Sequence, residues 1–569
     1  MEPRKARRGK GAGRRGATRS KARGSPPRLG KRAASGAAPA FVVLGQVVTM
    51  DADSRVLPAG AVYVSQGTIV DVKAASAPAP TGFAGAPRVD SGGTIFPGLL
   101  ELHNHLAYDV LPLWKVPQKF QNRAQWQDTV AYKTLVTKPM GIVGKNASLL
   151  PAICRYVECK CLFGGVTTSQ GIRLVSAAGI GKYFRGLVRN VEQPADKALP
   201  AASSLIADPD ATDPRKFWAT LQAKAKGGGA YLLHLSEGLD AAAEKHFASL
   251  DLGGGTWAIN GALAGIHCAA LTPGDFGTLA GHGGSMVWSP MSNMLLYGGT
   301  ADVAAAKAAG VPMGIGADWS PSGSKNLLGE LKVALLYSAQ NGNLFSPEDI
   351  VGMATTAGAR ILKWGDRLGS LEAGKYADLL AVEGTSTNPC EALIRSKETG
   401  IHLVVVGGVP RYGLPDLMGA LGASGEQLAV GGQWRSLFAE DSDPEVPGIA
   451  FAQASAMLSE ALGKLPELAA GAEGHLSRAL STSRISKRGW TLALDEVEDT
   501  GQDPRPRLSV GGSPTGPALP RTAAASTPVA PVPVRLDPPT VVDDPQFLDL
   551  VEGEGNPPAW LRQGLRGLY

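Results

Sequence analysis

The sequence has 569 residues, of which 44% are apolar and 19% are charged, so it can form several globular domains with a sizeable core. The net charge of +6 comes from one end, because residues 1–32 hold 13 of the 56 Lys and Arg residues but one of the 50 Asp and Glu residues. The rest of the chain is slightly acidic, which argues against a nucleic-acid-binding body, and its sequence has no run of about 18 apolar residues that would predict a membrane span.

The N-terminal segment, residues 1–38, is basic and lacks hydrophobic periodicity, so we predict a disordered tail. It has no apolar region of the kind that a secretory signal needs. Its charge alone can attract nucleic acid or an anionic membrane, but a solvated extension explains the composition more simply. Nucleic acid is therefore expected as a partner only through this tail.

Two β-rich segments flank a long middle region. Residues 39–94 contain the alternating stretches FVVLGQVVTMD and GAVYVSQGTIVDV, and residues 366–415 contain YADLLAVEG and HLVVVGGVPR. Although about 300 residues separate them, such segments can form one domain around an insertion. We expect a small antiparallel sheet built from both flanks.

The middle region, residues 95–365, alternates short apolar strands with helical or glycine-rich stretches. About 255 residues lie between Ile95 and residue 350, and a (β/α)₈ barrel needs about 250. We therefore predict an α/β fold with a parallel barrel. Its predicted strands include 164–169, 183–189, 230–235, 261–268, 285–288 and 311–318.

The C-terminal extension, residues 416–569, gives weaker signals. Residues 447–471 predict an amphipathic helix, and residues 502–541 are proline-rich and resemble a linker. The last stretch, from residue 543 onward, regains Trp, Leu and Phe and is expected to dock on the body as a closing helix.

The five cysteines form an odd and sparse set, which favours free thiols in a reducing compartment over a disulfide framework. Cys154, Cys159 and Cys161 lie close together, but their spacing fits no common zinc module, so buried thiols are the better interpretation. We therefore expect a cytoplasmic protein.

Five polar residues lie at the ends of predicted strands. His103 and His105 are two residues apart on one strand, so both imidazoles face the same side. His234, His267 and Asp318 follow at intervals of 129, 33 and 51 residues, which correspond to barrel units of about 31 residues. The intervals place the five residues on strands 1, 5, 6 and 8, whose carboxyl ends meet at one mouth of a barrel.

These motifs together resemble the amidohydrolase superfamily, close to the cytosine deaminase and chlorotriazine hydrolase type. The resemblance covers roughly residues 40–415 and implies a distorted (β/α)₈ TIM barrel with a small flanking β-sandwich built from both ends of the barrel segment. The matching motifs are PGLLELHNH (97–105), GGVTT (164–168), HLSE (234–237), GIHC (265–268), SPMSN (289–293), GIGAD (314–318) and LGSLEAGKYADLLAV (368–382).

The resemblance implies one divalent metal ion, with Zn²⁺ preferred and Fe²⁺ or Mn²⁺ as alternatives. Many relatives hold a second ion through a carboxylated lysine on strand 4. Lys197 and Lys216 are the candidates for that lysine, but neither lies at a clear strand end, so we favour a mononuclear site. The implied metal ligands are His103, His105, His234 and Asp318.

The resemblance also implies three catalytic residues. Glu237, at the HxxE position after His234, would shuttle a proton to a ring nitrogen or leaving group. Asp318 would accept the proton of the attacking water, and His267 would polarise the substrate or orient that water. Without the resemblance, a solvated carboxylate and a core histidine would explain Glu237 and His267.

Four residues are expected to bind the substrate. Ser289 and Asn293 follow strand 7. Many relatives have His-Cys-Pro where this chain has Trp288-Ser289-Pro290, so the indole would make the bottom of the pocket apolar or supply a stacking surface. Arg123 lies in the long loop 106–136, which we interpret as a lid, and its guanidinium can pair with a substrate carboxylate.

We expect a metal-dependent hydrolase that acts on carbon–nitrogen bonds, other than peptide bonds, in a small cyclic or amide-like substrate. Metal-activated hydroxide would attack the substrate in a deaminase-type reaction. The alternatives are a dehalogenating hydrolase, which uses the same attack, and a catalytically inactive barrel that serves as a binding or assembly module. A homo-oligomer is also open at this point.

Overall fold

In the computed structural model the described residues are 40–194, 196–205, 213–440, 443, 445–471, 489–494 and 529–569. The predicted tail, residues 1–38, and most of the predicted linker, residues 502–541, lie outside them. In the described part of the chain, no helix combines the length and the apolar character that crossing a bilayer requires.

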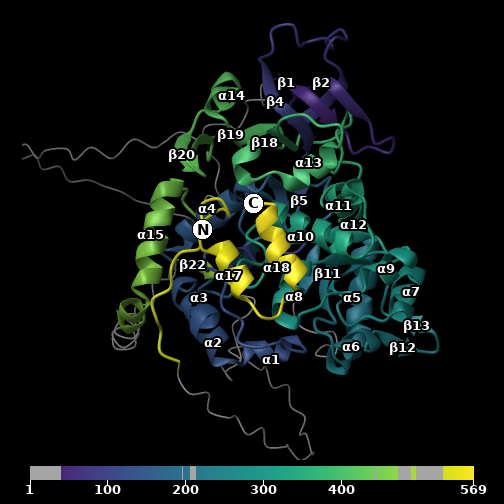
Figure 1. The fold of residues 1–569 in the computed structure, drawn as a ribbon, viewed down its shortest axis with the longest axis vertical. Coiled ribbons are helices and arrows are strands. Elements are labelled where there is room, and N and C mark those ends of the chain that lie inside the picture. Colours follow the sequence, from purple (N-terminus) through teal and green to yellow (C-terminus); the bar gives the residue numbers. More distant parts are fainter. Residues whose placement is uncertain are drawn as a thin grey trace, which may run out of the picture. The chain divides into compact units, whose positions relative to one another are not determined.

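A nine-stranded sheet joins the two flanks of the chain, in the order β20-β21-β19-β18-β17-β4-β1-β2-β3 (Figure 1). Ile95 on β4 lies opposite Ala381 on β17, so segments far apart in sequence meet at the centre of the sheet. The sheet is antiparallel except where β1 pairs with β4, and it continues beyond residue 415 through β20 and β21. Its strands are β1 (Phe41–Val48), β2 (Val56–Ser65), β3 (Thr68–Ala74), β4 (Arg88–Pro97), β17 (Leu379–Glu383), β18 (Ile401–Val406), β19 (Val409–Gly413), β20 (Glu426–Val430) and β21 (Gln433–Leu437).

Eight short parallel strands between the flanks close into a ring. They form a three-stranded and a five-stranded sheet, and backbone hydrogen bonds join these sheets at both seams. Ala202 N–H donates to the Val191 carbonyl over 2.8 Å at one seam, and Leu102 N–H donates to the Ile315 carbonyl over 3.3 Å at the other. The ring strands are β5 (Leu99–Leu100), β6 (Val166–Ser169), β9 (Arg189–Asn190), β10 (Ser203–Leu205), β11 (Tyr231–Leu235), β14 (Leu263–His267), β15 (Ser285–Trp288) and β16 (Met313–Ile315).

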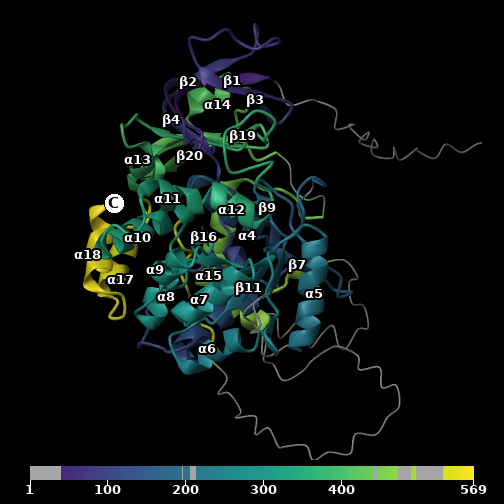
Figure 2. The same cartoon turned by 90° about the vertical axis from the view of Figure 1, so that its right-hand side faces the viewer.

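Helices follow the ring strands as in a (β/α)₈ barrel (Figures 1 and 2), except that β6 is followed by β7 and β8, and β9 leads to β10 without a helix. The strands β11, β14 and β15 are buried at every position, because neighbours cover both of their faces. Burial of each large aliphatic side chain there stabilises the fold by about 1.5–3 kcal/mol. The helices are α4 (Leu150–Phe163), α5 (Pro214–Lys226), α6 (Ala241–Ala248), α7 (Pro273–Gly281), α8 (Pro290–Tyr297), α9 (Val303–Ala308), α10 (Leu327–Gln340), α11 (Pro347–Met353) and α12 (Thr356–Ile361).

The predicted strand at residues 183–189 is wrong as one element. Tyr183 ends β8 (Gly181–Tyr183), which pairs with β7 (Arg173–Ser176). β7 also pairs with β22 (Trp490–Leu492), so the three strands form a small antiparallel sheet. Arg189 begins the ring strand β9, and the residues between form a turn that connects the two strands. A separate hairpin joins β12 (Asp251–Gly253) and β13 (Thr256–Trp257).

The long segment after β5 is folded into short helices instead of an open loop. Arg123 begins one of them, and Trp126 lies on the same turn and is buried. The helices are η1 (Leu106–Tyr108), α1 (Arg123–Gln127), α2 (Val130–Tyr132), η2 (Lys133–Thr137) and α3 (Lys138–Val143).

The C-terminal extension packs against the barrel helices. α18 (Ala559–Gly567) lies beside α10, and α17 (Phe547–Gly553) lies beside α18; both are drawn in yellow (Figures 1 and 2). Phe547 and Leu561 share an apolar cluster with Met291 and Leu295 of α8. The other helices of this half of the chain are α13 (Pro389–Arg395), η4 (Glu398–Gly400), α14 (Pro415–Ala420) and α15 (Phe451–Gly463). All five cysteines are free and buried.

Candidate active site

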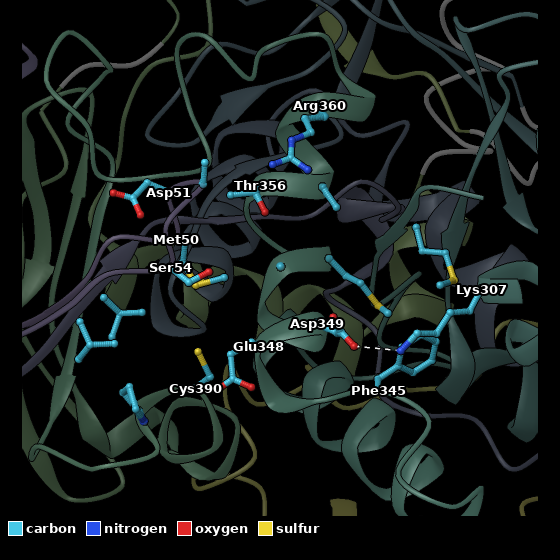
Figure 3. Close-up of a pocket in the computed structure, with 18 of the residues that line it drawn as sticks. Met50, Asp51, Ser54, Lys307, Phe345, Glu348, Asp349, Thr356, Arg360 and Cys390 are labelled. Atoms are coloured by element: carbon cyan, nitrogen blue, oxygen red, sulfur yellow. Dashed lines mark hydrogen bonds and ion pairs between the residues drawn. The ribbon is translucent and has the colours of Figure 1, made fainter. Parts of the chain in front are cut away.

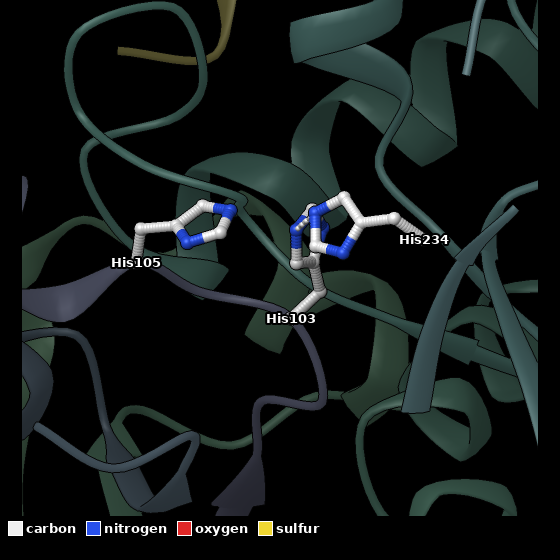
Figure 4. A group of neighbouring side chains, drawn as sticks. All are labelled: His103, His105 and His234. Carbon is white, nitrogen blue, oxygen red and sulfur yellow. Dashed lines mark hydrogen bonds between the residues drawn. The ribbon is translucent and has the colours of Figure 1, made fainter. Parts of the chain in front are cut away.

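Four histidines and one aspartate, from the ends of four strands, meet at the carboxyl end of the barrel: His103 and His105 follow β5, His234 is on β11, His267 on β14, and Asp318 follows β16. His103 Nε2 lies 3.2 Å from His234 Nε2 and 3.4 Å from Asp318 Oδ1. His105 Nε2 lies 3.6 Å from the same Asp318 oxygen, and the His103 and His267 rings are 4.8 Å apart. All five side chains are buried. Figure 4 shows the rings of His103 and His105, from one segment, close to that of His234, from another.

The backbone is strained where it presents these groups. His267 and Asp318 have positive φ angles of 67° and 68°, and Ser236 and Cys268, each beside a strand end, have 52° and 51°. Residues other than glycine rarely adopt this left-handed backbone conformation, and each instance costs on the order of 1–3 kcal/mol. At His267 the unusual φ interrupts the alternation of β14, so the ring reaches the mouth although Ile266 is the residue paired with His234.

The chemistry of the donor set fits a divalent metal ion. Burial, together with the neighbouring histidines, lowers the pKa of His103 well below its ordinary value, and burial does the same to His267. Neutral imidazoles have the lone pair that a metal ligand needs. His103, His105 and His234 offer ligand atoms within 4.8 Å of one another, and so does the alternative group His103, His267 and Asp318. Three nitrogens and a carboxylate oxygen form a typical zinc ligand set.

Two residues that we predicted to bind substrate contact the histidines instead. Ser289 Oγ lies 2.8 Å from His103 Nδ1, and Asn293 Nδ2 lies 3.0 Å from His267 Nδ1. Both side chains are fully buried. Each therefore holds the ring nitrogen that faces away from the centre of the cluster, as the outer partners of metal-binding histidines do.

The structure does not bring Trp288 to the cluster. Its indole N–H donates to Thr300 Oγ1 over 2.8 Å, and its ring lies 5.2 Å from that of Tyr337 on α10. Val287, the preceding residue, pairs with Ile266, which in turn pairs with His234. Since side chains alternate along a strand, Trp288 lies on the opposite face from that row.

Glu237 and Arg123 lie beside the histidines. Glu237 Oε2 is 3.6 Å from His267 Nε2 and 3.7 Å from Arg123 Nη1. Tyr297 donates its hydroxyl proton to Glu237 Oε1 over 2.7 Å. Burial raises the pKa of Glu237, and the nearby guanidinium of Arg123 partly opposes that rise. No motif marks Tyr297 in the sequence; its place four residues after Asn293 on a helix is the signal that could have found it.

Neither candidate for a bridging lysine reaches the cluster. Lys216 is exposed on α5, and Lys197 is exposed in the segment before β10. β10, the fourth strand of the ring, carries Ser203 and Ser204. The geometry therefore favours the mononuclear arrangement over a lysine-bridged pair of ions.

A cavity of about 520 Å³ lies elsewhere in the molecule (Figure 3). It is lined by residues of the nine-stranded sheet and of α11 and α12, and none of the cluster residues is among them. Lys307 at its rim pairs with Asp349 over 3.1 Å. The histidine cluster and this cavity are thus separate features.

Comparison with known proteins relates the barrel region and its flanks to a family. A family model described as the amidohydrolase family matches residues 224–411, which include His234, His267 and Asp318. A 5-methylthioadenosine/S-adenosylhomocysteine deaminase of Syntrophobacter fumaroxidans is 27% identical over 384 residues, which are 60% of this chain and 84% of that protein. The chain is thus similar to proteins of the amidohydrolase family.

Shorter matches within the amidohydrolase superfamily are more similar. A 5-methylthioadenosine/S-adenosylhomocysteine deaminase of Desulforudis audaxviator is 38% identical over 130 residues, and an S-triazine hydrolase of Gordonia rubripertincta is 37% identical over 125 residues. These matches cover 22% and 21% of this chain, and the chain spans 30% and 26% of the two relatives.

Solved structures of the superfamily share the fold. The triazine hydrolase of Arthrobacter aurescens aligns with a TM-score of 0.52 at 20% identity, over 65% of this chain and 94% of that chain. The alignment supports the (β/α)₈ barrel that the hydrogen bonds at the two seams define.

Proposed function

We propose that this protein is a metal-dependent hydrolase that acts on carbon–nitrogen bonds, other than peptide bonds, in a small cyclic or amide-like substrate. The observation that carries the proposal is the close approach of three imidazole nitrogens and one carboxylate oxygen, 3.2–3.6 Å apart, beside the buried carboxyl group of Glu237. Its relatives that are named deaminases and S-triazine hydrolase support a deaminase-type reaction.

One divalent ion, with Zn²⁺ preferred and Fe²⁺ or Mn²⁺ as alternatives, would be held by four side chains. When bound, such an ion supplies Lewis acidity and a hydroxide nucleophile near neutral pH. The ring nitrogens that Ser289 and Asn293 hold would keep two of the histidines in a fixed orientation. The proposed ligands are His103, His105, His234 and Asp318.

The remaining groups handle protons. Water adds to the carbon that bears the amine, the carbon–nitrogen bond breaks, and the nitrogen leaves as ammonia. Asp318 accepts the proton of the attacking water, and Glu237 delivers a proton to the ring nitrogen or the leaving amine. His267 donates a hydrogen bond that orients the substrate, and Arg123 supplies a positive charge beside it.

We further propose that the barrel is distorted and that the nine-stranded sheet corresponds to the small flanking β-sandwich. Phe41 and Val62 on one flank share an apolar cluster with Leu403 and Met418 on the other, so the two flanks bury a common core. The proposed boundaries are 39–94 and 366–415 for the sheet, with β20 and β21 added to it, and 95–365 for the barrel. A cytoplasmic location and a homo-oligomer stay predictions.

The test combines metal analysis of the purified full chain with a screen for ammonia release. The expected result is one divalent ion per chain and ammonia release from an amino-heterocycle or a cyclic amide. Chloride release from a chlorinated ring would favour the second candidate, a dehalogenating hydrolase, which the likeness to S-triazine hydrolase supports. A chain without stoichiometric metal would contradict the proposal and favour an inactive barrel.

A further inference from the structure

Two tryptophans outside the metal cluster begin chains of hydrogen bonds that end on Glu237 and His267. We propose that the indole N–H groups of Trp126 and Trp288 set the direction of these chains and thereby fix which atom of each catalytic side chain faces the reacting centre. The inference rests on the proposed function for its catalytic part, but the hydrogen-bond directions can be measured without turnover.

The first chain passes through Tyr297. The Trp126 indole N–H donates to Tyr297 Oη over 2.8 Å, and Tyr297 Oη lies 2.7 Å from Glu237 Oε1. An indole N–H can only donate, so the phenol oxygen must accept there. Tyr297 is fully buried, and its own proton therefore goes to Glu237 Oε1.

This chain distinguishes the two oxygens of Glu237. Oε1 is occupied by the proton of Tyr297, whereas Oε2 faces His267 Nε2 at 3.6 Å and Arg123 Nη1 at 3.7 Å. A proton that Glu237 takes up or releases during the reaction is consequently held at Oε2. Tyr297 and Trp126 act as positioning residues, because both work through Glu237.

The second chain passes through Thr300 and Asn293. Trp288 donates to Thr300 Oγ1 over 2.8 Å, and the Thr300 hydroxyl donates to Asn293 Oδ1 over 3.2 Å. The amide of Asn293 then presents Nδ2 to His267 Nδ1 at 3.0 Å. The opposite orientation of the amide would take away the acceptor of the Thr300 proton.

The second chain selects one tautomer of His267. Because Nδ1 accepts from Asn293, the proton of the neutral ring is on Nε2, on the side of Glu237 Oε2. A protonated Nε2 donates a hydrogen bond and has no lone pair for a metal. The two chains together make His267 a donor at the site and leave His103, His105 and His234 as the nitrogen ligands.

One short helix carries the middle of both chains. Asn293 and Tyr297 are four residues apart on α8 and so lie on the same face. The helix is held from behind, because Met291 N–H donates to Glu330 Oε1 over 2.9 Å and the Asn556 amide donates to the Leu295 carbonyl over 2.9 Å. The C-terminal extension thus supports the element that orients Glu237 and His267.

The first test measures the tautomer directly. The full chain, labelled with ¹⁵N-histidine and loaded with zinc alone, is examined by long-range ¹H–¹⁵N correlation, and His267→Asn identifies the signals of His267. We expect a protonated Nε2 and a bare Nδ1 in the wild type, and a second tautomer in Trp288→Phe and in the nearly isosteric Thr300→Val. Trp434→Phe, at an exposed tryptophan, is the matched control and should change nothing.

A wild-type spectrum with the proton on Nδ1, or with a zinc-bound Nε2, would overturn the inference for His267. So would an unchanged tautomer in both variants. The measurement needs no substrate, so it still decides the matter if the screen for ammonia release fails and the proposed function is abandoned.

The second test is a double-mutant cycle on ammonia release. We expect Tyr297→Phe to lower kcat about 10- to 100-fold while KM changes by less than about 3-fold. In the Glu237→Gln background the same change should cost less than about 2-fold, because Tyr297 acts only through Glu237. Equal losses in both backgrounds would contradict the positioning role.

Discussion

Two buried polar clusters in this molecule are built on opposite rules. In the first, between the C-terminal extension and the barrel, Lys160 Nζ lies 2.7 Å from Asp537 Oδ2, and Lys325 pairs with Asp537 and, over 2.9 Å, with Asp544. Each of these buried charges has an opposite charge in contact. In the second, at the mouth of the barrel, imidazole faces imidazole.

The contrast indicates that the first cluster stabilises the fold and that the second is built to bind a ligand. Complementary buried charges satisfy one another and tie two segments together. His103 Nε2 and His234 Nε2 lie 3.2 Å apart, so two groups of the same kind face each other. His267 and Asp318 join this cluster from residues with positive φ angles. The positive φ angles at His267 and Asp318 store backbone strain at this cluster, which is typical of functional sites.

The largest effect is expected from removing one histidine of the cluster at the mouth of the barrel. His234→Ala removes a proposed ligand that lies 3.2 Å from His103, so the purified chain should lose its divalent metal and ammonia release should fall by about a thousand-fold or more. The thermal stability of the metal-free protein should stay the same or rise. His282→Ala, at an exposed histidine on the end of α7, is the matched control. Retained metal in His234→Ala would contradict the ligand assignment.

Disrupting the ionic cluster, which consists of Lys160, Lys325, Asp537 and Asp544, should lower stability and leave metal binding unchanged. Asp537→Asn leaves Lys160 and Lys325 buried without their shared counter-charge, so the free energy of unfolding should fall by about 3–5 kcal/mol. Metal content per folded chain should not change. Denaturant unfolding with metal analysis checks both, and Glu460→Gln, which breaks the exposed pair with Lys464, should leave the stability unaltered. A loss of metal with intact stability would reverse the distinction between the clusters.

Glu158 on α4 offers a third buried polar group, satisfied by the backbone N–H groups of Leu187 and Val188 at 3.0 and 3.2 Å. Burial raises its pKa from 4.5 to about 7. The folded chain therefore binds more protons than the unfolded chain between these values, and stability falls as pH rises through that window. Glu158→Gln does not titrate, so its stability relative to the wild type should increase by up to about 3 kcal/mol from pH 4.5 to pH 7 and above.

Denaturant unfolding of both proteins across this range of pH measures the difference. A stability difference between Glu158→Gln and the wild type that does not change with pH would show that the carboxylate is ionised at no cost in the fold. Glu158 would then belong with the charge-compensated ionic cluster.

Much of the mouth could be predicted from the sequence because its residues follow strand periodicity. The spacing of His103 and His105, and the strand ends before His234 and Asp318, placed all four at one rim, where the structure has them. Trp288 was misplaced, although the same rule of alternation assigns it to the other face of β15.

The partners of the catalytic side chains could not be predicted, because they depend on tertiary contacts. Tyr297 and Thr300 carry no motif, and their roles follow from hydrogen bonds across elements. The ionic cluster was equally hidden: Asp537 lies in a stretch whose proline content predicted a linker, yet it is buried against Lys160. The proline content of that stretch predicts its extended backbone but does not predict its contact with the barrel.

The smallest effect tests how the mouth is held in place. Ser289→Ala removes the hydroxyl 2.8 Å from His103 Nδ1 and leaves every proposed ligand intact. Outer partners of metal-binding histidines typically contribute 10- to 100-fold to metal affinity, so competition with a chelator should show about that loss, with the ion still bound at saturation. Ser292→Ala, at the next buried serine of α8, is the matched control. If Ser289→Ala and Ser292→Ala weakened the metal equally, the orientation of His103 would depend on the packing of α8 and not on this hydrogen bond.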